Sequence, residues 1–170
     1  MFNLNFDVSL SSNYKNNAQI ARVLTEDWMS KNMFCPICGN ERINQYNANK
    51  PVADFFCITC NNDYELKSKN GNLTNTVPDG AYDTMIERIT GNNNPHLFYM
   101  GYSKETMKVN NLIFIPKYFF VPDIIKKRNP LPPTAKRAGW IGCNILLGKV
   151  PEQGKINIIY NGQLQDKNII

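Results

Sequence analysis

The sequence contains a single histidine, His96, among its 170 residues. Zinc proteases and zinc-dependent base deaminases need histidine at a metal that keeps one coordination position open for water. No histidine precedes residue 96, so the cysteine-rich segment of residues 35–60 has none to offer a catalytic metal. Both enzyme classes are therefore excluded, and His96 itself is expected to be a surface or packing residue.

Long apolar runs and an export signal are also missing. No segment approaches the roughly 20 consecutive apolar residues of a membrane-spanning helix. Residues 1–7, MFNLNFD, contain neither the basic region nor the long apolar stretch of a signal peptide. The five cysteines are odd in number, which suits a reduced compartment better than a disulfide framework. We therefore expect a cytoplasmic protein that does not bind a membrane.

The composition is that of an ordinary globular domain, with 42% hydrophobic and 19% charged residues. The length predicts one domain spanning residues 1–170. A formal net charge of +5 and a pI near 8.9 favour an anionic partner.

Hydrophobic periodicity predicts an α/β fold in the broad sense, that is, α+β with a mixed sheet. Helices are expected over residues 14–31, capped by the Ser-Ser-Asn of 11–13, and over residues 81–90. Strands are expected over residues 52–58, 64–68, 96–102, 109–115, 140–147 and 156–160. The first two strands should form a hairpin, and 109–115 should be central because it is almost entirely apolar. Residues 70–80 are expected to form a loop because of their glycines and proline.

Two Cys-x-x-Cys pairs, Cys35/Cys38 and Cys57/Cys60, are separated by eighteen residues. Two such pairs at this spacing strongly indicate a tetrahedral zinc site. Because all four ligands would be cysteine, no coordination position stays open and the zinc is expected to be structural. Four buried free thiols or two disulfides are the alternatives. The fifth cysteine, Cys143, is expected to be a small buried residue without a chemical role.

Asp54, Glu65 and Lys67 flank the second cysteine pair in the pattern Asp-x10-Glu-x-Lys. Glu65 and Lys67 are two residues apart, so their side chains share one face of a strand. If Asp54 faces Glu65 across the hairpin, the two carboxylates converge with the lysine beside them. Two carboxylates can hold a hard divalent cation, and a lysine can orient a water and offset developing charge, as phosphodiester hydrolysis requires. The alternative is a solvated charged face, although the apolar neighbours of Asp54 argue against it.

Several longer motifs carry a family resemblance. They are, in chain order, TEDW (25–28), CPxCGN (35–40), PVADF (51–55), ELKSK (65–69), DGAY (79–82), NNP (93–95) and PTAKRAGWIGCN (133–144). With these motifs the sequence resembles the catalytic domain of the Dam-replacing family of methyl-directed type II restriction endonucleases. The resemblance covers essentially all of residues 5–165, and its last motif is long and specific.

The resemblance implies a PD-(D/E)xK restriction-endonuclease-like core with inserted zinc knuckles over residues 35–60. It implies Mg²⁺-dependent cleavage of double-stranded DNA at adenine-methylated GATC sites. Asp54, Glu65 and Lys67 match the catalytic triad, and Mg²⁺ is expected on Asp54, Glu65 and the main-chain carbonyl of Leu66. Cys35, Cys38, Cys57 and Cys60 match the zinc ligands. The family's C-terminal winged-helix domain is expected to be absent from these 170 residues.

Residues 117–137 contain six basic residues and one acidic residue, Asp123. Such a segment suits phosphate contacts, although a solvated basic loop is the alternative. Trp140, flanked by glycines, is expected to pack on adenine methyl groups in the major groove, the alternative being a core tryptophan as expected of Trp28. Glu26 is a candidate helper for a second metal ion, or else an ordinary helix-surface residue. The expected DNA-binding residues are Lys126, Lys127, Arg128, Lys136, Arg137 and Trp140.

Three other interpretations compete with the nuclease. HNH nucleases often contain two cysteine knuckles, but they need a histidine base near them, which this sequence lacks. A non-catalytic zinc-ribbon module that binds DNA would explain the cysteines and the charge, but not Asp54, Glu65 and Lys67 on an apolar hairpin. An inactive nuclease relic is disfavoured because the three residues are all present. As a nuclease with one active site, the protein is expected to act as a monomer or a transient dimer on DNA.

Overall fold

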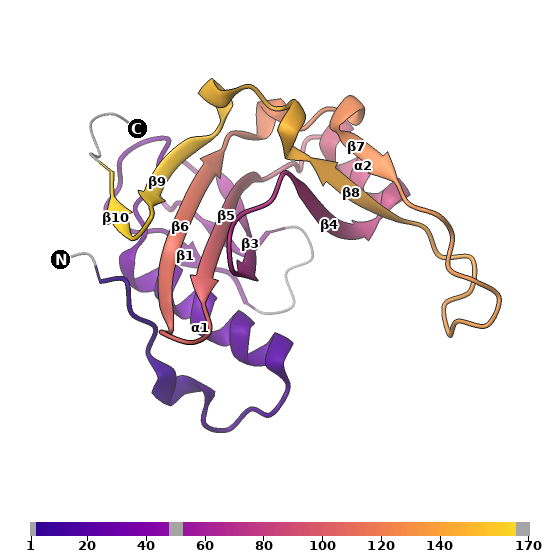
Figure 1. Cartoon of the computed structure of the whole chain (residues 1–170). Coiled ribbons are helices and arrows are strands. Elements are labelled where there is room, and N and C mark those ends of the chain that lie inside the picture. Colours follow the sequence, from indigo (N-terminus) through magenta and orange to yellow (C-terminus); the bar gives the residue numbers. More distant parts are fainter. Residues whose placement is uncertain (1–2, 48–52, 166–170) are drawn as a thin grey trace. The chain divides into compact units, whose positions relative to one another are not determined.

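The computed structural model describes residues 3–47 and 53–165. Contacts divide the chain into two compact units (Figure 1). The first unit comprises Met1–Leu73, Pro95–Ile115 and Ile156–Ile170, and the second comprises Thr74–Asn94 and Pro116–Lys155. Each unit is built from discontinuous stretches of sequence, and each is described below by itself. None of the helices formed by the described residues is both long and apolar enough to cross a membrane.

The first unit is built around a mixed sheet, as the periodicity predicts. Among the described residues the sheet has seven strands in the order β1-β2-β3-β5-β6-β9-β10. Strands β3 and β5 are parallel, and every other neighbouring pair is antiparallel. The strands are β1 (Asn44–Gln45), β2 (Phe55–Phe56), β3 (Asp63–Asn70), β5 (His96–Ser103), β6 (Lys108–Ile115), β9 (Ile156–Tyr160) and β10 (Gln163–Leu164).

Strand β6 has neighbours on both sides, β5 and β9, which confirms that the apolar run of 109–115 is an interior strand. Strands β2 and β3 form the expected hairpin, with Phe55 opposite Tyr64. The paired part of β2 is much shorter than the strand predicted over 52–58, and residue 52 lies outside the described residues. Because β2 begins only at Phe55, the edge of β3 that follows Tyr64 has no strand partner on that side among the described residues. Side chains therefore have room at this edge.

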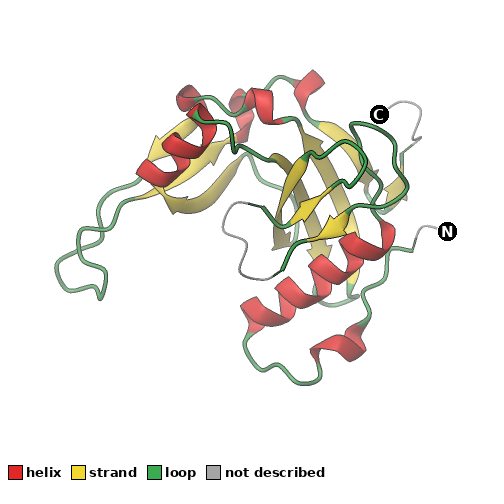
Figure 2. Cartoon of the chain, turned by 180° about the vertical axis from the view of Figure 1, so that it is seen from behind, coloured by secondary structure: helices red, strands yellow, loops and turns green. Residues whose placement is uncertain are grey.

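Helix α1 (Asn17–Asn32) lies across one face of this sheet (Figure 2). Leu24 and Trp28 are spaced by one helical turn and are buried together with Met29 in the core of the unit. The predicted cap at residues 11–13 is wrong, because the Asn16 side chain accepts hydrogen bonds from the N–H groups of Ala18 and Gln19. The preceding residues form a 3₁₀ turn, η1 (Val8–Ser11). The core position of Trp28, in contrast, is confirmed.

The second unit contains an antiparallel sheet of three strands among the described residues, in the order β4-β8-β7. Its elements are β4 (Thr76–Ala81), α2 (Tyr82–Thr90), β7 (Ile125–Lys127) and β8 (Gly142–Leu146), with short 3₁₀ turns η2 (Lys117–Phe119), η3 (Pro122–Ile124), η4 (Leu147–Lys149) and η5 (Glu152–Gly154).

Strand β4 corrects the prediction of a loop over residues 70–80. Pro78 and Gly80 lie inside this strand, where they normally signal an interruption. They are tolerated because β4 is at the edge of its sheet and its register shifts between Asp79 and Ala81, as in a β-bulge. The strand predicted over 140–147 begins only at Gly142, so Trp140 precedes it.

Candidate functional site

The four paired cysteines converge in the first unit. Their Sγ atoms all lie within 4.8 Å of one another. The Cys35–Cys60 and Cys38–Cys57 sulfur pairs are each 3.6 Å apart. Four thiolates around a tetrahedral zinc at about 2.3 Å would be about 3.8 Å apart, which agrees with this spacing. All four thiols are free, so the disulfide alternative is wrong, and the cluster could hold a metal ion such as zinc.

The two cysteine pairs form knuckles with the same backbone geometry. The N–H of Gly39 donates to the carbonyl of Cys35 at 2.9 Å, and the N–H of Asn61 donates to the carbonyl of Cys57 at 2.8 Å. Gly39 and Asn61 occupy equivalent places after the second cysteine, with φ of 81° and 62°. Glycine and asparagine are the residues that best tolerate this left-handed conformation. The residues that follow each cysteine pair therefore favour the backbone turn of both knuckles.

Polar side chains also contact the cysteine sulfurs. The hydroxyl of Tyr64 lies 2.8 Å from the sulfur of Cys35. The Asn62 amide donates to the sulfur of Cys60 at 3.2 Å, and its oxygen lies 3.1 Å from Nε2 of His96. His96 is 1% exposed and packs against the Tyr64 ring, so it is a packing residue of the kind expected. Burial raises the pKa of the Cys35 thiol to about 12, which means that a thiolate there needs a cation.

The hairpin places Asp54 beside the residues of β3 that the sequence singles out. The Asp54 N–H donates to the carbonyl of Tyr64 at 2.9 Å. The Asp54 Oδ2 accepts a hydrogen bond of 2.8 Å from the Leu66 N–H. Lys67 Nζ lies 3.6 Å from Glu65 Oε1. The Asp54 carboxylate thus lies at the edge of β3 beside Leu66, which is the residue between Glu65 and Lys67.

This arrangement suits an oxygen-liganded cation. In an extended strand the N–H and C=O of one residue point to the same edge, so the Leu66 carbonyl lies on the edge where Asp54 binds the Leu66 N–H. Asp54 retains its second carboxylate oxygen, Oδ1, for another partner. The residues predicted to hold Mg²⁺, which are Asp54, Glu65 and the Leu66 carbonyl, therefore offer the hard oxygen donors that such an ion prefers.

The charge balance around Asp54 favours a cation as well. Burial is the main reason why the pKa of Asp54 lies above its ordinary value, and the nearby Glu26 carboxylate raises it further. The Leu66 N–H, Lys67 and Arg22 lower the pKa but do not outweigh burial. The ionised Asp54 is therefore under-compensated by the protein, and a bound cation would supply the missing positive charge.

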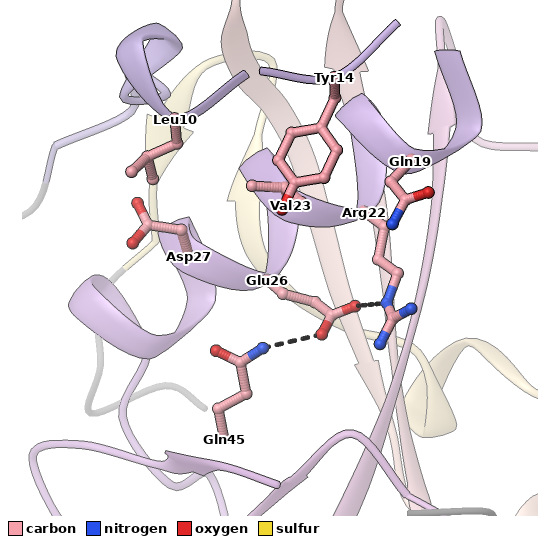
Figure 3. Close-up of a pocket in the computed structure, with 8 residues that line it drawn as sticks. All are labelled: Leu10, Tyr14, Gln19, Arg22, Val23, Glu26, Asp27 and Gln45. Carbon is pink, nitrogen blue, oxygen red and sulfur yellow. Dashed lines mark hydrogen bonds and ion pairs between the residues drawn. The ribbon is translucent and has the colours of Figure 1, made fainter. Parts of the chain in front are cut away.

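A solvent-accessible pocket of about 330 Å³ adjoins α1 (Figure 3). It is lined by Leu10, Tyr14, Gln19, Arg22, Val23, Glu26, Asp27 and Gln45. Glu26 uses both oxygens here: Oε2 pairs with Arg22 Nε at 2.9 Å, and Oε1 accepts from the Gln45 amide at 2.9 Å. Glu26 was among the residues expected from the sequence, but neither of its partners was. The Arg22–Glu26 spacing of four residues on a helix could have revealed the first, whereas no local signal connects Gln45 to this helix.

The second unit carries the predicted basic residues. Lys126 and Lys127 are exposed on β7, and the Lys127 ammonium lies 4.9 Å from the centre of the Tyr82 ring. Arg137 and Lys136 belong to the segment before β8, and the Arg137 guanidinium lies 4.5 Å from the centre of the Trp140 ring. Trp140 is half-buried, in contrast to the fully buried Trp28.

Arg128 differs from the other basic residues because it is fixed by its own unit. Its guanidinium donates to the carbonyl of Asp79 at 3.0 Å and lies 5.8 Å from the Trp140 ring centre. A Cβ on Gly142 would collide with the Arg128 guanidinium, so only glycine fits there without displacing it. Arg128 therefore lies against Gly142 and Trp140 rather than extending freely into solvent.

Comparison with known protein families identifies the family to which the chain is similar. A family model described as "DpnI: Dam-replacing family" matches residues 2–170, which is essentially the whole chain. The family resemblance expected from the sequence motifs is thereby confirmed.

The cysteine cluster predicts a protein whose folding depends on a metal. Cys57→Ser should lose bound zinc and much of its stability, because structural zinc contributes about 10–16 kcal/mol of apparent binding energy in small peptides. Zinc content per chain and thermal melting measure both effects. Cys143→Ala is the matched control, because Cys143 is buried but is not a member of the cluster. It should retain the wild-type zinc content, and a Cys57→Ser variant that also retains it would contradict the assignment.

The electrostatics of Asp54 predict that Asp54→Asn stabilises the cation-free protein. Because the folded protein raises the pKa of Asp54, its ionisation opposes folding at neutral pH. Asparagine keeps an oxygen acceptor for the Leu66 N–H without the charge, so the melting temperature should rise by about 2–4 °C per kcal/mol gained. The gain should shrink as the pH falls through the raised pKa, because the wild-type carboxyl is then neutral too.

With magnesium, the wild type should become the more stable of the two proteins, because the ion should raise the melting temperature of the wild type but not that of Asp54→Asn. Asp123→Asn, at an exposed position in the second unit, serves as the control and should leave both behaviours unchanged. An Asp54→Asn variant that is less stable than the wild type at neutral pH would contradict the argument.

Proposed function

The chain belongs to the Dam-replacing family, and we propose that it is a methyl-directed restriction endonuclease that cleaves double-stranded DNA at adenine-methylated GATC sites in the presence of Mg²⁺. The observation that carries this proposal is the hydrogen bond from the Leu66 N–H to Asp54 Oδ2, which holds Asp54 against the strand that bears Glu65 and Lys67. A DNA-binding zinc module that does not cleave would have no use for a buried carboxylate at that position.

The proposal includes a PD-(D/E)xK core. The β2–β3 hairpin supplies its acidic and basic residues, and β5 pairs in parallel with β3 behind them. Residues 1–170 then form one nuclease domain, into which the knuckles of residues 35–60 are inserted. The two compact units would be parts of this domain, with different tasks.

In this proposal Asp54, Glu65 and the Leu66 carbonyl hold Mg²⁺. When bound, the ion would polarise a phosphoryl oxygen and lower the pKa of a water. The protein's own contribution is orientation. The Asp54 N–H donates to the Tyr64 carbonyl, and its Oδ2 accepts from the Leu66 N–H, so the residue is held against β3 at two points. Metal ligands that are fixed in this way need little rearrangement when the substrate arrives, and such preorganisation is usually the largest source of rate enhancement.

Lys67 has a separate role from the oxygen donors. Its ammonium lies 3.6 Å from the Glu65 carboxylate and its side chain is 28% exposed, so it is neither buried in the core nor free in solvent. From this position Nζ can donate a hydrogen bond to an attacking water and stabilise negative charge on the phosphoryl group. Glu65 keeps the lysine at that face of β3.

The cysteine cluster has a structural role in the proposal. All four positions of a tetrahedral zinc would be filled by thiolates, which leaves none for substrate or water. The second knuckle lies at the turn between β2 and β3, so the metal would fix the hairpin that presents Asp54, Glu65 and Lys67. Zinc therefore supports the active site without taking part in the reaction.

The proposed DNA-binding residues belong to the second unit. They are Lys126, Lys127, Arg128, Lys136, Arg137 and Trp140. Their roles differ, because the exposed lysines suit phosphate contacts whereas Arg128 fixes the surroundings of Trp140. The half-buried Trp140 ring is the proposed contact of the adenine methyl groups. Because the chain has one active site, two cleavage events are needed for a double-strand break, by successive nicking or by a transient dimer.

Digestion of adenine-methylated and unmethylated plasmid, with and without Mg²⁺, tests the function. We expect cleavage only of the methylated plasmid with Mg²⁺, and a loss of about 100-fold or more in Lys67→Ala, in line with the loss of one fixed donor that stabilises charge in the transition state. Lys104→Ala, at an exposed turn after β5, should cleave like the wild type. Binding of methylated DNA without any Mg²⁺-dependent cleavage would favour the non-catalytic zinc module instead.

The salt dependence of DNA binding tests the second unit. In Lys126→Ala/Lys127→Ala, the slope of log K against log salt should become shallower by about 0.9 for each phosphate that the two lysines neutralise in the wild type. Lys15→Ala/Lys104→Ala removes the same charge from exposed positions in the first unit and should leave the slope unchanged. Equal slopes in the wild type and in Lys126→Ala/Lys127→Ala would remove β7 from the DNA interface.

A further inference from the structure

We propose that Arg22 senses the DNA substrate and couples its binding to that of the catalytic cation. In the free protein the Arg22 guanidinium pairs with Glu26, whereas in the complex a DNA phosphate replaces Glu26 as the partner of Arg22. Glu26 then presents its full negative charge to the cation site beside it. The inference rests on the proposed nuclease function, because it requires a phosphodiester near Asp54.

The Arg22–Glu26 pair is unequally exposed. The Glu26 side chain is 12% exposed, whereas that of Arg22 is 50% exposed and lines the open pocket beside α1 (Figure 3). Glu26 is thus held in place by its surroundings, and Arg22 is the member of the pair that a solvent-borne anion can reach. A substrate phosphate that approaches Asp54 also approaches this pair, because Glu26 is hydrogen-bonded to Gln45, and Gln45 lies opposite Phe55, the residue after Asp54.

Exchange of partners by Arg22 costs little. Half-exposed ion pairs contribute little to stability because water competes with the pair. A guanidinium binds phosphate through two parallel hydrogen bonds, which is among the stronger polar contacts in proteins. A phosphate on the DNA backbone is therefore able to compete with Glu26 for Arg22.

Glu26 does not need to move when Arg22 leaves. Its second oxygen, Oε1, accepts a hydrogen bond from the Gln45 amide at 2.9 Å, and this neutral partner stays in place. The carboxylate therefore remains hydrogen-bonded but loses its counter-charge. The change at the cation site is electrostatic and needs no rearrangement of the backbone.

The Arg22–Glu26 pair is connected to Asp54 through strand β1. Gln45, whose amide donates to Glu26, lies opposite Phe55, the residue after Asp54, and the N–H of Tyr46 donates to the Asp54 carbonyl at 2.9 Å. Removing the Arg22 charge while keeping that of Glu26 makes the site more negative, and a more negative site binds a divalent cation more tightly. By linkage, the bound cation strengthens DNA binding by the same factor. The protein would thus avoid assembling a tight cation site before its substrate is present.

Calorimetric titration with Ca²⁺, with and without a short duplex carrying one adenine-methylated GATC site, tests the coupling. In the wild type, DNA should raise the Ca²⁺ affinity by at least about fivefold, the lower end of usual coupling between sites. Arg22→Gln should bind Ca²⁺ more tightly than the wild type without DNA, and DNA should add less. Glu26→Gln should bind Ca²⁺ weakly in both states and should also lose most of the enhancement.

Arg42→Gln is the matched control, because Arg42 is exposed in the first unit and has no part in this pair. It should reproduce the wild-type affinities. The proposal is overturned if Arg22→Gln or Glu26→Gln keeps the full wild-type enhancement, or if Arg22→Gln binds Ca²⁺ more weakly than the wild type without DNA. If the wild type cleaves DNA and one of these variant results is found, the coupling alone is refuted. A wild type that neither cleaves DNA nor binds Ca²⁺ would refute the nuclease itself.

Discussion

The hydrogen bond between the Leu66 N–H and the Asp54 carboxylate is the contact on which the proposed active site depends. Leu66 lies between Glu65 and Lys67, so this one contact brings Asp54 to the part of β3 that carries the other two proposed catalytic residues. The contact exists because β2 begins only at Phe55, opposite Tyr64, and leaves the edge of β3 after Tyr64 open. Since the second cysteine knuckle forms the turn of this hairpin, a metal there would stabilise the site by roughly as much as a domain's whole net stability.

Burying Asp54 near Glu26 works against folding and therefore calls for a functional explanation. Both groups are acidic, and the raised pKa of Asp54 shows that the surrounding basic groups compensate its charge incompletely. Perturbed carboxylates of this kind cluster at functional sites, because a site that is ready for a cation is unfavourable without one. The Cys35 thiol is a second example, because burial raises its pKa and a bound metal would offset the cost of ionising it.

The sequence predicted the parts of this structure that depend on local patterns. The cysteine spacing, the apolar run of β6 and the family motifs all led to correct expectations, because each is encoded within a short stretch or a long shared motif. Strand β4 was missed because Pro78 and Gly80 are tolerated only at a sheet edge, which is a property of the tertiary structure. The contact of Glu26 with Gln45 was missed for the same reason, since it joins a helix to a strand far along the chain.

The distribution of charge between the two units fits a division of tasks within the proposed nuclease. The second unit carries nine basic and five acidic residues, and thus four of the five net positive charges of the chain. The first unit, which contains Asp54, Glu65 and the cysteines, is nearly neutral. Attraction of a polyanion needs an excess of positive charge, whereas a cation site needs the opposite. Placing the two requirements on different parts of the chain lets each be met without weakening the other.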